Sequence, residues 1–208
     1  MDILNTTQGS PEWFRGKVGV ISASNISNVL AKKGTATREN YISELIAQVA
    51  TGLIPEIDGP ALRWGKENEQ SARSAYEFLK GDVVEQVGFI YGKDRRIGAS
   101  PDGIILDKKL GLEIKAPYTS KVHIDFLLMD KIKLEYIYQV QFSMFVTGLE
   151  QWDFASYDKR MKKEIIKIHT IERDLGLMER FENECGEFIA EMDKGLEKLQ
   201  ITWGSQWN

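Results

Sequence analysis

Apolar residues recur along the chain with two different spacings, and these spacings predict its secondary structure. Between residues 38 and 51 they recur every three or four positions and stop before Gly52, which is typical of an amphipathic helix. The same spacing predicts helices over 64–79, 120–130, 134–146 and 175–199. Short β-prone runs between turn residues predict strands over 83–91, 97–99, 103–106, 110–115, 152–157 and 165–171.

Helices before and after a central group of strands predict the fold class: α/β, with a mixed central sheet flanked by helices. We expect residues 1–208 to form a single domain, because 208 residues with 42% hydrophobic content can bury one substantial core. No window approaches the roughly 18 apolar residues that a membrane span requires, and no signal-peptide pattern is present. The sequence therefore favours a cytoplasmic protein without a membrane partner.

Charge and cysteine content narrow the classes of protein further. The single cysteine, Cys185, excludes an internal disulfide and a four-cysteine metal site within one chain. A net charge of −4 argues against a protein that coats nucleic acid with its whole surface, but it is compatible with a nuclease whose carboxylates bind metal. The sequence contains no G-x-x-x-x-G-K-[ST] loop, which excludes a P-loop motor in this chain.

Three ionisable residues lie in two strands where apolar residues would be expected. Asp102 follows a Ser-Pro pair, whereas Glu113 and Lys115 alternate in one strand, so their side chains point to the same face. If the two strands are neighbours, Asp102 shares that pocket. Two carboxylates and a backbone carbonyl suit Mg²⁺ or Mn²⁺, and a lysine beside them can orient a metal-bound water or stabilise a phosphate. Either half alone is more typical of a solvated Pro-Asp-Gly turn or an exposed strand face.

Together the two halves resemble the signature of the PD-(D/E)XK nuclease superfamily. Over nearly its whole length the chain is also similar to lambda exonuclease and the YqaJ-type phage recombination nucleases. Six ordered segments carry the resemblance: GVISAS at 19–24, WGKENE at 64–69, SPDG at 100–103, GLEIK at 111–115, QVQFSM at 139–144 and YDKRMK at 157–162.

The resemblance implies an enzyme, a deoxyribonuclease, and its setting. The expected activity is an Mg²⁺-dependent 5′-to-3′ exonuclease, with Mn²⁺ as a substitute, that degrades one strand of linear double-stranded DNA to mononucleotides. It would leave 3′ single-stranded tails for recombination. The expected partners are double-stranded DNA ends, two further copies in a homotrimeric ring, and a single-strand annealing protein. The expected location is the cytoplasm of a bacterial host cell, with a phage or prophage gene as the source.

The resemblance also assigns the catalytic centre by position. It implies that Asp102 and Glu113 bind metal together with the Ile114 carbonyl, that Glu69 helps to bind a second ion, and that Lys115 is the catalytic lysine. Two ions per active site, about 4 Å apart, would stabilise the attacking water and the departing oxygen of an in-line displacement. For Glu69, a solvated helix face is the alternative.

Further residues match positions that contact DNA in the family. Lys17, Ser24 and Ser100 match the residues that grip the terminal 5′-phosphate, and hydroxyl donors with a cation are suited to a dianion. Lambda exonuclease has arginine at the position that Lys17 matches. A lysine is a point charge instead of a bidentate fork, so we expect nearby Arg15 to share the task. Leu62, expected in a loop, matches an apolar wedge that helps to separate the last base pairs.

Two alternatives to an exonuclease remain open. The catalytic motif does not distinguish cutting at ends from internal cutting, so a PD-(D/E)XK endonuclease is the first. A catalytically inactive DNA-binding module is the second, and it predicts a damaged metal site, whereas the acidic positions and Lys115 carry competent residue types. Gln141 matches an active-site glutamine of the family, with a hydrogen bond in the core as its alternative role.

Overall fold

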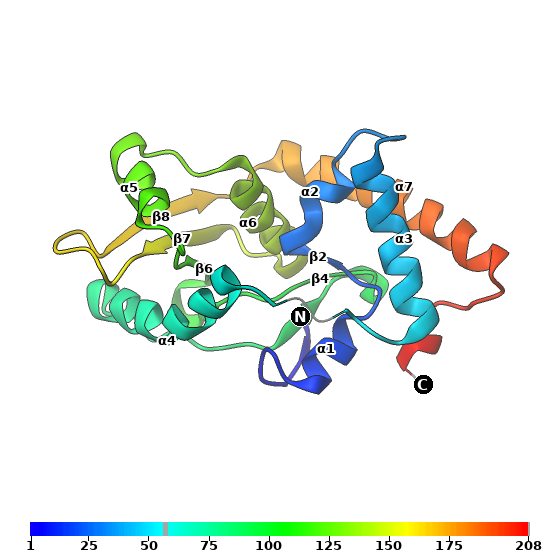
Figure 1. Cartoon of the computed structure of the whole chain (residues 1–208), viewed down its shortest axis with the longest axis horizontal. Helices are drawn as coiled ribbons and strands as arrows, with labels where there is room; N and C mark the ends of the chain where they lie inside the picture. Colours follow the sequence, from blue (N-terminus) through cyan, green and yellow to red (C-terminus); the bar gives the residue numbers. More distant parts are fainter. Residues whose placement is uncertain (56–57, 208) are drawn as a thin grey trace.

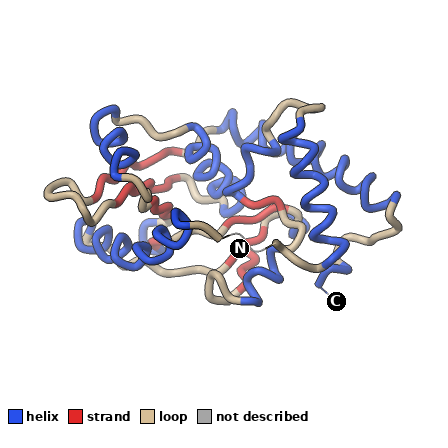
Figure 2. Tube along the Cα trace, viewed as in Figure 1, coloured by secondary structure: helices blue, strands red, loops and turns tan. Residues whose placement is uncertain are grey.

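The computed structural model describes residues 1–55 and 58–207, which form a mixed α/β fold (Figures 1 and 2). Its helices are α1 Pro11–Lys17, α2 Ile26–Val29, α3 Ala36–Thr51, α4 Pro60–Lys80, α5 Ser120–Met129, α6 Leu134–Thr147 and α7 Leu175–Lys198. Its strands are β1 Asp2–Leu4, β2 Ile21–Ser22, β3 Phe89–Tyr91, β4 Ile97–Ala99, β5 Gly103–Ile105, β6 Leu110–Lys115, β7 Gln151–Tyr157 and β8 Ile166–Glu172. Within these residues, no helix is both long and apolar enough to cross a membrane.

The strands form two four-stranded sheets that meet at residues 100–102. The first has the order β1-β3-β4-β2 with β2 parallel to β4, and the second has the order β5-β6-β7-β8 with β6 parallel to β7. Pro101 lies between β4 and β5 and has no N–H with which to continue a ladder, so the pairing pattern changes there. The mixed α/β class with flanking helices is confirmed, although the strands are divided over two sheets instead of one central sheet.

Helices cover both faces of the second sheet, as the red strands between blue helices in Figure 2 show. On one face Tyr76 of α4 packs with Leu112 and Ile114 of β6. On the other face Phe126 of α5 and Val140 of α6 pack against β7. Successive side chains of β6 therefore face two different layers, which decides where its polar residues point.

A separate core fills the space between the first sheet and helices α3, α6 and α7. Leu45 of α3, Phe142 of α6 and Phe181 of α7 pack there with Ile97 of β4, and all four side chains are buried. Helix α6 is shared between this core and the second sheet, because its opposite sides pack in different clusters. The position of α6 is thus fixed from two directions.

Most predicted helices agree with the structure to within two residues at each end, but the helix expected over 64–79 begins earlier. Helix α4 starts at Pro60, since Gly59 precedes it and proline is favoured at the first helical position. Leu62 therefore lies in the first turn of a helix, and the expectation that it lies in a loop was wrong.

Among the strands, the one predicted over 83–91 is mostly absent. Its last three residues form β3, whereas Glu85 makes an isolated bridge to Ile104. The short strands β1 and β2 were not predicted, because strands of two or three residues are too short to display an alternating pattern. The short helices α1 and α2 were not predicted either. The start of α1 does carry a recognisable signal, since the Ser10 side chain caps the helix and Pro11 follows it.

The core predicts a large difference between two phenylalanines. We expect Phe181→Ala to lower the free energy of unfolding by about 3–5 kcal/mol, because Phe181 is fully buried and its removal leaves a cavity. Phe78→Ala is the matched control: its ring is 92% exposed, and we expect a change within about 0.5 kcal/mol. Urea unfolding of both variants measures the difference, and equal effects would contradict the described core.

Candidate active site

Strand β6 presents Glu113 and Lys115 on the face toward α6, while Leu112 and Ile114 pack on the opposite face. Lys115 Nζ lies 2.6 Å from Glu113 Oε1. Gln139 of α6 donates through Nε2 to the same carboxylate oxygen at 2.7 Å and accepts from Lys115 Nζ at 3.1 Å. The three polar side chains form a closed triangle, so the predicted pairing of Glu113 and Lys115 on one face is observed.

Asp102 joins this centre from the start of the neighbouring strand. Its backbone N–H donates to Leu112 O at 3.1 Å, and its Oδ2 accepts from the Ile114 N–H at 2.5 Å. The Asp102 carboxylate thus accepts the hydrogen bond that a backbone carbonyl would accept if the β5–β6 ladder continued. In an extended strand the N–H and C=O of one residue point to the same side, so the Ile114 carbonyl is directed toward the edge that carries Asp102.

Glu69 approaches from α4 and is held by a buried arginine. Arg73, one helical turn further on, donates through Nη2 to Glu69 Oε1 at 2.5 Å and through Nε to the Asp102 carbonyl at 3.3 Å. Arg73 therefore connects the helix carboxylate with the strand carboxylate. Sequence reasoning missed Arg73, although the Glu–Arg pair at a spacing of four residues on a predicted helix was a usable signal.

Negative charge is concentrated at this centre. Burial and the Glu113 carboxylate raise the pKa of Asp102 well above its ordinary value. Burial acts to lower the pKa of Lys115, but the Glu113 and Asp102 carboxylates outweigh burial and the pKa is raised. Lys115 is consequently held in its charged form, and Asp102 carries an electrostatic strain that a further cation would relieve.

The donor set fits a hard divalent cation. Carboxylates at Asp102, Glu113 and Glu69 and a carbonyl at Ile114 are the oxygen ligands that Mg²⁺ uses, and the raised pKa of Asp102 favours added positive charge. Over residues 1–55 and 58–207, no three Asp, Glu, His or Cys side chains already converge on one ligand point. Lys115 and Arg73 neutralise two of the carboxylates, so metal binding would require a local exchange of partners.

Two of the four residues expected at a terminal phosphate gather around one indole ring. Lys17 Nζ lies 3.6 Å from the centroid of Trp13, and Trp13 Nε1 donates to Ser100 Oγ at 3.0 Å. Ser24 follows β2 and Ser100 follows β4. Since these strands are parallel, the two serines lie at the same end of the sheet. Burial lowers the pKa of Lys17 to about 8.

Arg15 does not join this group. Its side chain is exposed and its Nη2 donates to the Trp207 carbonyl at 3.4 Å, while Trp207 Nε1 donates to Arg15 O at 3.1 Å. On a short helix, residues two apart point in different directions, and Lys17 is the one directed inward. The expectation that Arg15 shares the phosphate-binding task is therefore not supported by its position.

Gln141 also lies away from the centre. Its Nε2 donates to Glu172 O at 2.7 Å, and its Oε1 accepts from the Asp174 N–H at 2.9 Å. The assignment of Gln141 to the catalytic centre was wrong in geometry, because residues two apart on a helix differ by about 200° around its axis. Gln139 occupies the catalytic face instead, and Gln141 has the core hydrogen-bonding role considered as its alternative.

A pocket of about 710 Å³ is lined in part by Lys115. Phe126, Tyr136 and Phe154 line its wall, and Ala61 of α4 borders it. Leu62, the next residue in α4, is 43% exposed. The exposed apolar side chain expected to act as a wedge thus follows directly in sequence a residue that borders the pocket lined by Lys115.

Comparison with known proteins agrees with this geometry. The crystal structure of an alkaline exonuclease, LHK-Exo, from Laribacter hongkongensis is similar with a TM-score of 0.84 at 38% identity, covering 92% of this chain and 96% of that chain. The structure of LHK-Exo in complex with dAMP gives a TM-score of 0.85 at 37% identity, with the same coverage. The uncharacterized protein ExoD of Escherichia coli K12 is 42% identical over 78 residues, which are 38% of this chain and 90% of ExoD.

Fold and site together define the class, a nuclease-type mixed α/β domain with an acidic centre that contains a lysine. The model of the YqaJ-like viral recombinase domain matches residues 12–150, and the chain belongs to this family. The expected relationship to the YqaJ-type recombination nucleases is confirmed. The family and the similarity to an alkaline exonuclease support a nuclease role.

The geometry predicts that replacing the two glutamines of α6 affects different properties of the protein. We expect Gln141→Ala to lower the free energy of unfolding by about 1–3 kcal/mol, because the Glu172 carbonyl and the Asp174 N–H lose their hydrogen bonds to a buried side chain. We expect Gln139→Ala to change stability less and to alter Mn²⁺ affinity, because it frees Glu113. Urea unfolding and calorimetric Mn²⁺ titration separate the two, and a selective loss of Mn²⁺ affinity in Gln141→Ala would contradict the assignment.

Proposed function

We propose that this chain is an Mg²⁺-dependent exonuclease that degrades the 5′-ended strand of linear double-stranded DNA to mononucleotides and leaves 3′ single-stranded tails for recombination. The observation that carries the proposal is the convergence of Asp102, Glu113 and Lys115 at the β5–β6 edge, with Glu69 held beside them. The complex of the relative LHK-Exo with dAMP supports a deoxynucleoside monophosphate as the product.

Asp102, Glu113 and the Ile114 carbonyl would hold one Mg²⁺, and Glu69 would help to hold a second, with Mn²⁺ as a substitute. When bound, the ions supply Lewis-acid stabilisation of the phosphate and a more acidic water. Gln139 fixes the orientation of Glu113 and Lys115. The ammonium of Lys115, kept charged by its carboxylate neighbours, orients the water and stabilises charge on the phosphate under attack.

The proposed polarity is supported by the short spacing between the residues expected to bind a terminal phosphate and the acidic centre. Ser100 and Asp102 are two residues apart, which is about 7 Å along an extended chain. A terminal 5′-phosphate held by Lys17, Ser24 and Ser100 would place the next phosphodiester near Asp102, so that cleavage releases one nucleotide. The remainder of the strand would continue past Lys115 into the adjacent pocket, beside Leu62. A homotrimeric ring and a single-strand annealing partner belong to the same proposal through the family.

The primary test is digestion of linear duplex DNA labelled at the 5′ or the 3′ terminus, with closed circular plasmid alongside. We expect Mg²⁺-dependent early release of the 5′ label as mononucleotide while the circle stays intact. Cutting of the circle would favour the endonuclease alternative. Silence on every substrate would favour the inactive DNA-binding module.

Lys115→Met tests the catalytic lysine. We expect kcat to fall by about 10²–10⁴-fold, the usual contribution of a positioned proton-transfer or charge-stabilising group, while DNA-end binding is retained. Lys194→Met, on the exposed surface of α7, is the matched control and should keep wild-type kcat. Steady-state digestion together with DNA binding in Ca²⁺ measures both properties, and a wild-type kcat in Lys115→Met would refute the assignment.

The lowered pKa of Lys17 predicts that the preference for a phosphorylated end depends on pH. Free Lys17 is charged below about pH 8 and loses its proton above it, so the preference should decline between about pH 7 and about pH 9.5. The measurement is the ratio of kcat/KM for 5′-phosphate and 5′-hydroxyl ends, in which the titration of other groups cancels. Lys17→Arg should keep the preference across this range, because guanidinium remains charged. A constant ratio in the wild type would argue against Lys17 as the phosphate ligand.

A further inference from the structure

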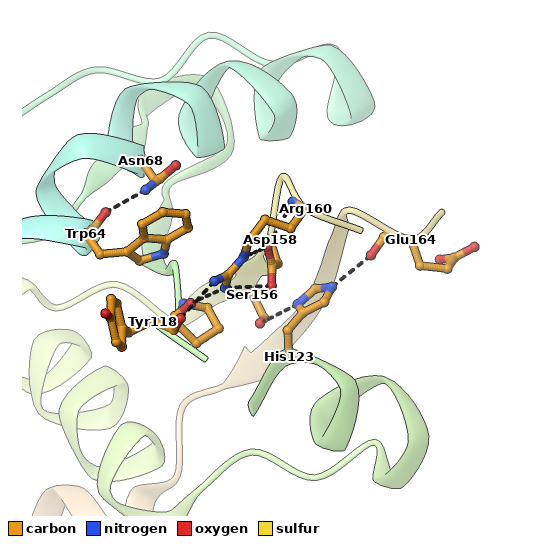
Figure 3. A network of polar contacts seen from close by, with 9 residues as sticks. Trp64, Asn68, Tyr118, His123, Ser156, Asp158, Arg160 and Glu164 are labelled. Carbon is orange, nitrogen blue, oxygen red and sulfur yellow. Dashed lines mark hydrogen bonds and ion pairs between the residues drawn. The ribbon is translucent and has the colours of Figure 1, made fainter. Parts of the chain in front are cut away.

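The turn between β7 and β8 contains the YDKRMK segment, to which the proposed function gives no role. Strand β7 runs parallel to β6 with Ser156 opposite Lys115, so the two strands leave the sheet side by side. Arg160 in this turn donates through Nη1 to the Tyr118 carbonyl at 2.9 Å and through Nη2 to the Pro117 carbonyl at 3.0 Å (Figure 3). The guanidinium thus binds the backbone two and three residues after Lys115.

The Asp158 carboxylate pairs with this guanidinium. Arg160 donates to Asp158 through Nε at 2.8 Å and through Nη2 at 2.9 Å, and its backbone N–H donates to the same carboxylate at 3.0 Å. The Asp158 side chain is fully buried. Burial alone would raise its pKa, but hydrogen bonds from Arg160 and Ser120 outweigh burial and lower the pKa to about 2. The pair therefore stays charged and its geometry is tightly defined.

The same guanidinium also contacts the helix that carries Glu69. Its central carbon lies 4.4 Å from the centroid of the Trp64 ring, and Trp64 packs edge-on against Tyr118 with the ring centroids 6.3 Å apart. Asn68 Nδ2 donates to Trp64 O at 2.7 Å within α4. Figure 3 shows Trp64 and Tyr118 on the same side of Arg160, so one side chain contacts both α4 and the exit of β6.

The far end of the turn is fixed as well. His123 of α5 is fully buried, and its Nε2 lies 2.8 Å from the Glu164 carbonyl while its Nδ1 lies 2.8 Å from Ser156 Oγ. His123 therefore connects α5 both to the end of the turn at Glu164 and to Ser156 of β7. A rigid support is what a side chain needs in order to hold two other elements in place.

We propose that Arg160 is a positioning residue that keeps Lys115 on β6 and Glu69 on α4 at a fixed separation for phosphodiester hydrolysis. The proposal rests on the proposed nuclease function and assigns to Arg160 no contact with DNA or with the reacting atoms. Because a misplacement of about 1 Å in a catalytic centre can reduce the rate about 10²-fold, loss of this connection should lower turnover more than substrate binding.

The principal variant is Arg160→Lys, which keeps a positive charge beside the buried Asp158 but cannot bridge two carbonyls as a planar fork does. We expect the single-turnover cleavage rate to fall about 10- to 100-fold, while DNA-end affinity in Ca²⁺ changes less than about threefold. We also expect weaker Mn²⁺ binding by calorimetry, a readout that needs no turnover. Arg180→Ala, an exposed arginine of α7 beside Tyr138, is the control and should match the wild type in all three.

A second variant separates positioning from simple loss of folding. In Arg160→Ala, added guanidinium at millimolar concentration should recover part of the lost rate, because the wild-type guanidinium site is partly open to solvent, with 38% of the Arg160 side chain exposed. Thermal unfolding of each variant identifies any that has lost its fold. If Arg160→Ala does not fold, Arg160→Lys still decides the outcome.

Three results would overturn the proposal. A wild-type cleavage rate in Arg160→Lys would show that the connection is dispensable. Weaker DNA-end binding with an unchanged single-turnover rate would make Arg160 a DNA contact instead. Slower cleavage with unchanged Mn²⁺ affinity and no guanidinium rescue would point to a general structural role. Failure of the proposed function itself is distinguishable, because it would be seen in the wild-type enzyme, as cutting of the circular plasmid, early release of the 3′ label or no cleavage at all.

Discussion

The arrangement of the candidate active site depends on how the hydrogen-bond ladder between β5 and β6 ends. At its last position a carboxylate replaces a backbone group, so that Asp102 Oδ2 accepts the N–H of Ile114 while the Asp102 N–H pairs with Leu112. This places Asp102 beside the end of β6 that carries Glu113 and Lys115. The position of this acidic centre is therefore set by strand pairing.

Electrostatics explains why this centre is built from so many coupled groups. Burial disfavours the charged form of Asp102, and repulsion from the Glu113 carboxylate adds to this effect, so that the pKa of Asp102 is raised. Lys115 and Arg73 offset this repulsion, and Gln139 adds a neutral donor to Glu113. The same imbalance of charge that destabilises the carboxylates on their own makes the site suited to a divalent cation and to the charge of a phosphate.

The elements that carry the site come from distant parts of the chain and are held together by contacts at one end of the second sheet. Helix α4 supplies Glu69, β6 supplies Glu113 and Lys115, and the β7–β8 turn reaches both through Arg160. Of the residues proposed to bind a terminal phosphate, Lys17 ends α1, and Ser24 and Ser100 follow β2 and β4 of the first sheet. This sheet is joined to the second through the short link before Asp102. An activity that needs both groups therefore depends on how the two sheets are joined.

The sequence by itself determined the α/β class, the long helices and the pairing of Glu113 with Lys115, because helical and strand periodicities are local and strong. Six ordered segments also pointed to the nuclease family. Only the tertiary structure decided which glutamine of α6 faces the carboxylates, where Arg15 points, and that Arg160 binds the backbone after Lys115. Those outcomes depend on the rotation of a helix about its axis and on contacts between segments about forty residues apart, and neither leaves a periodic trace in the chain.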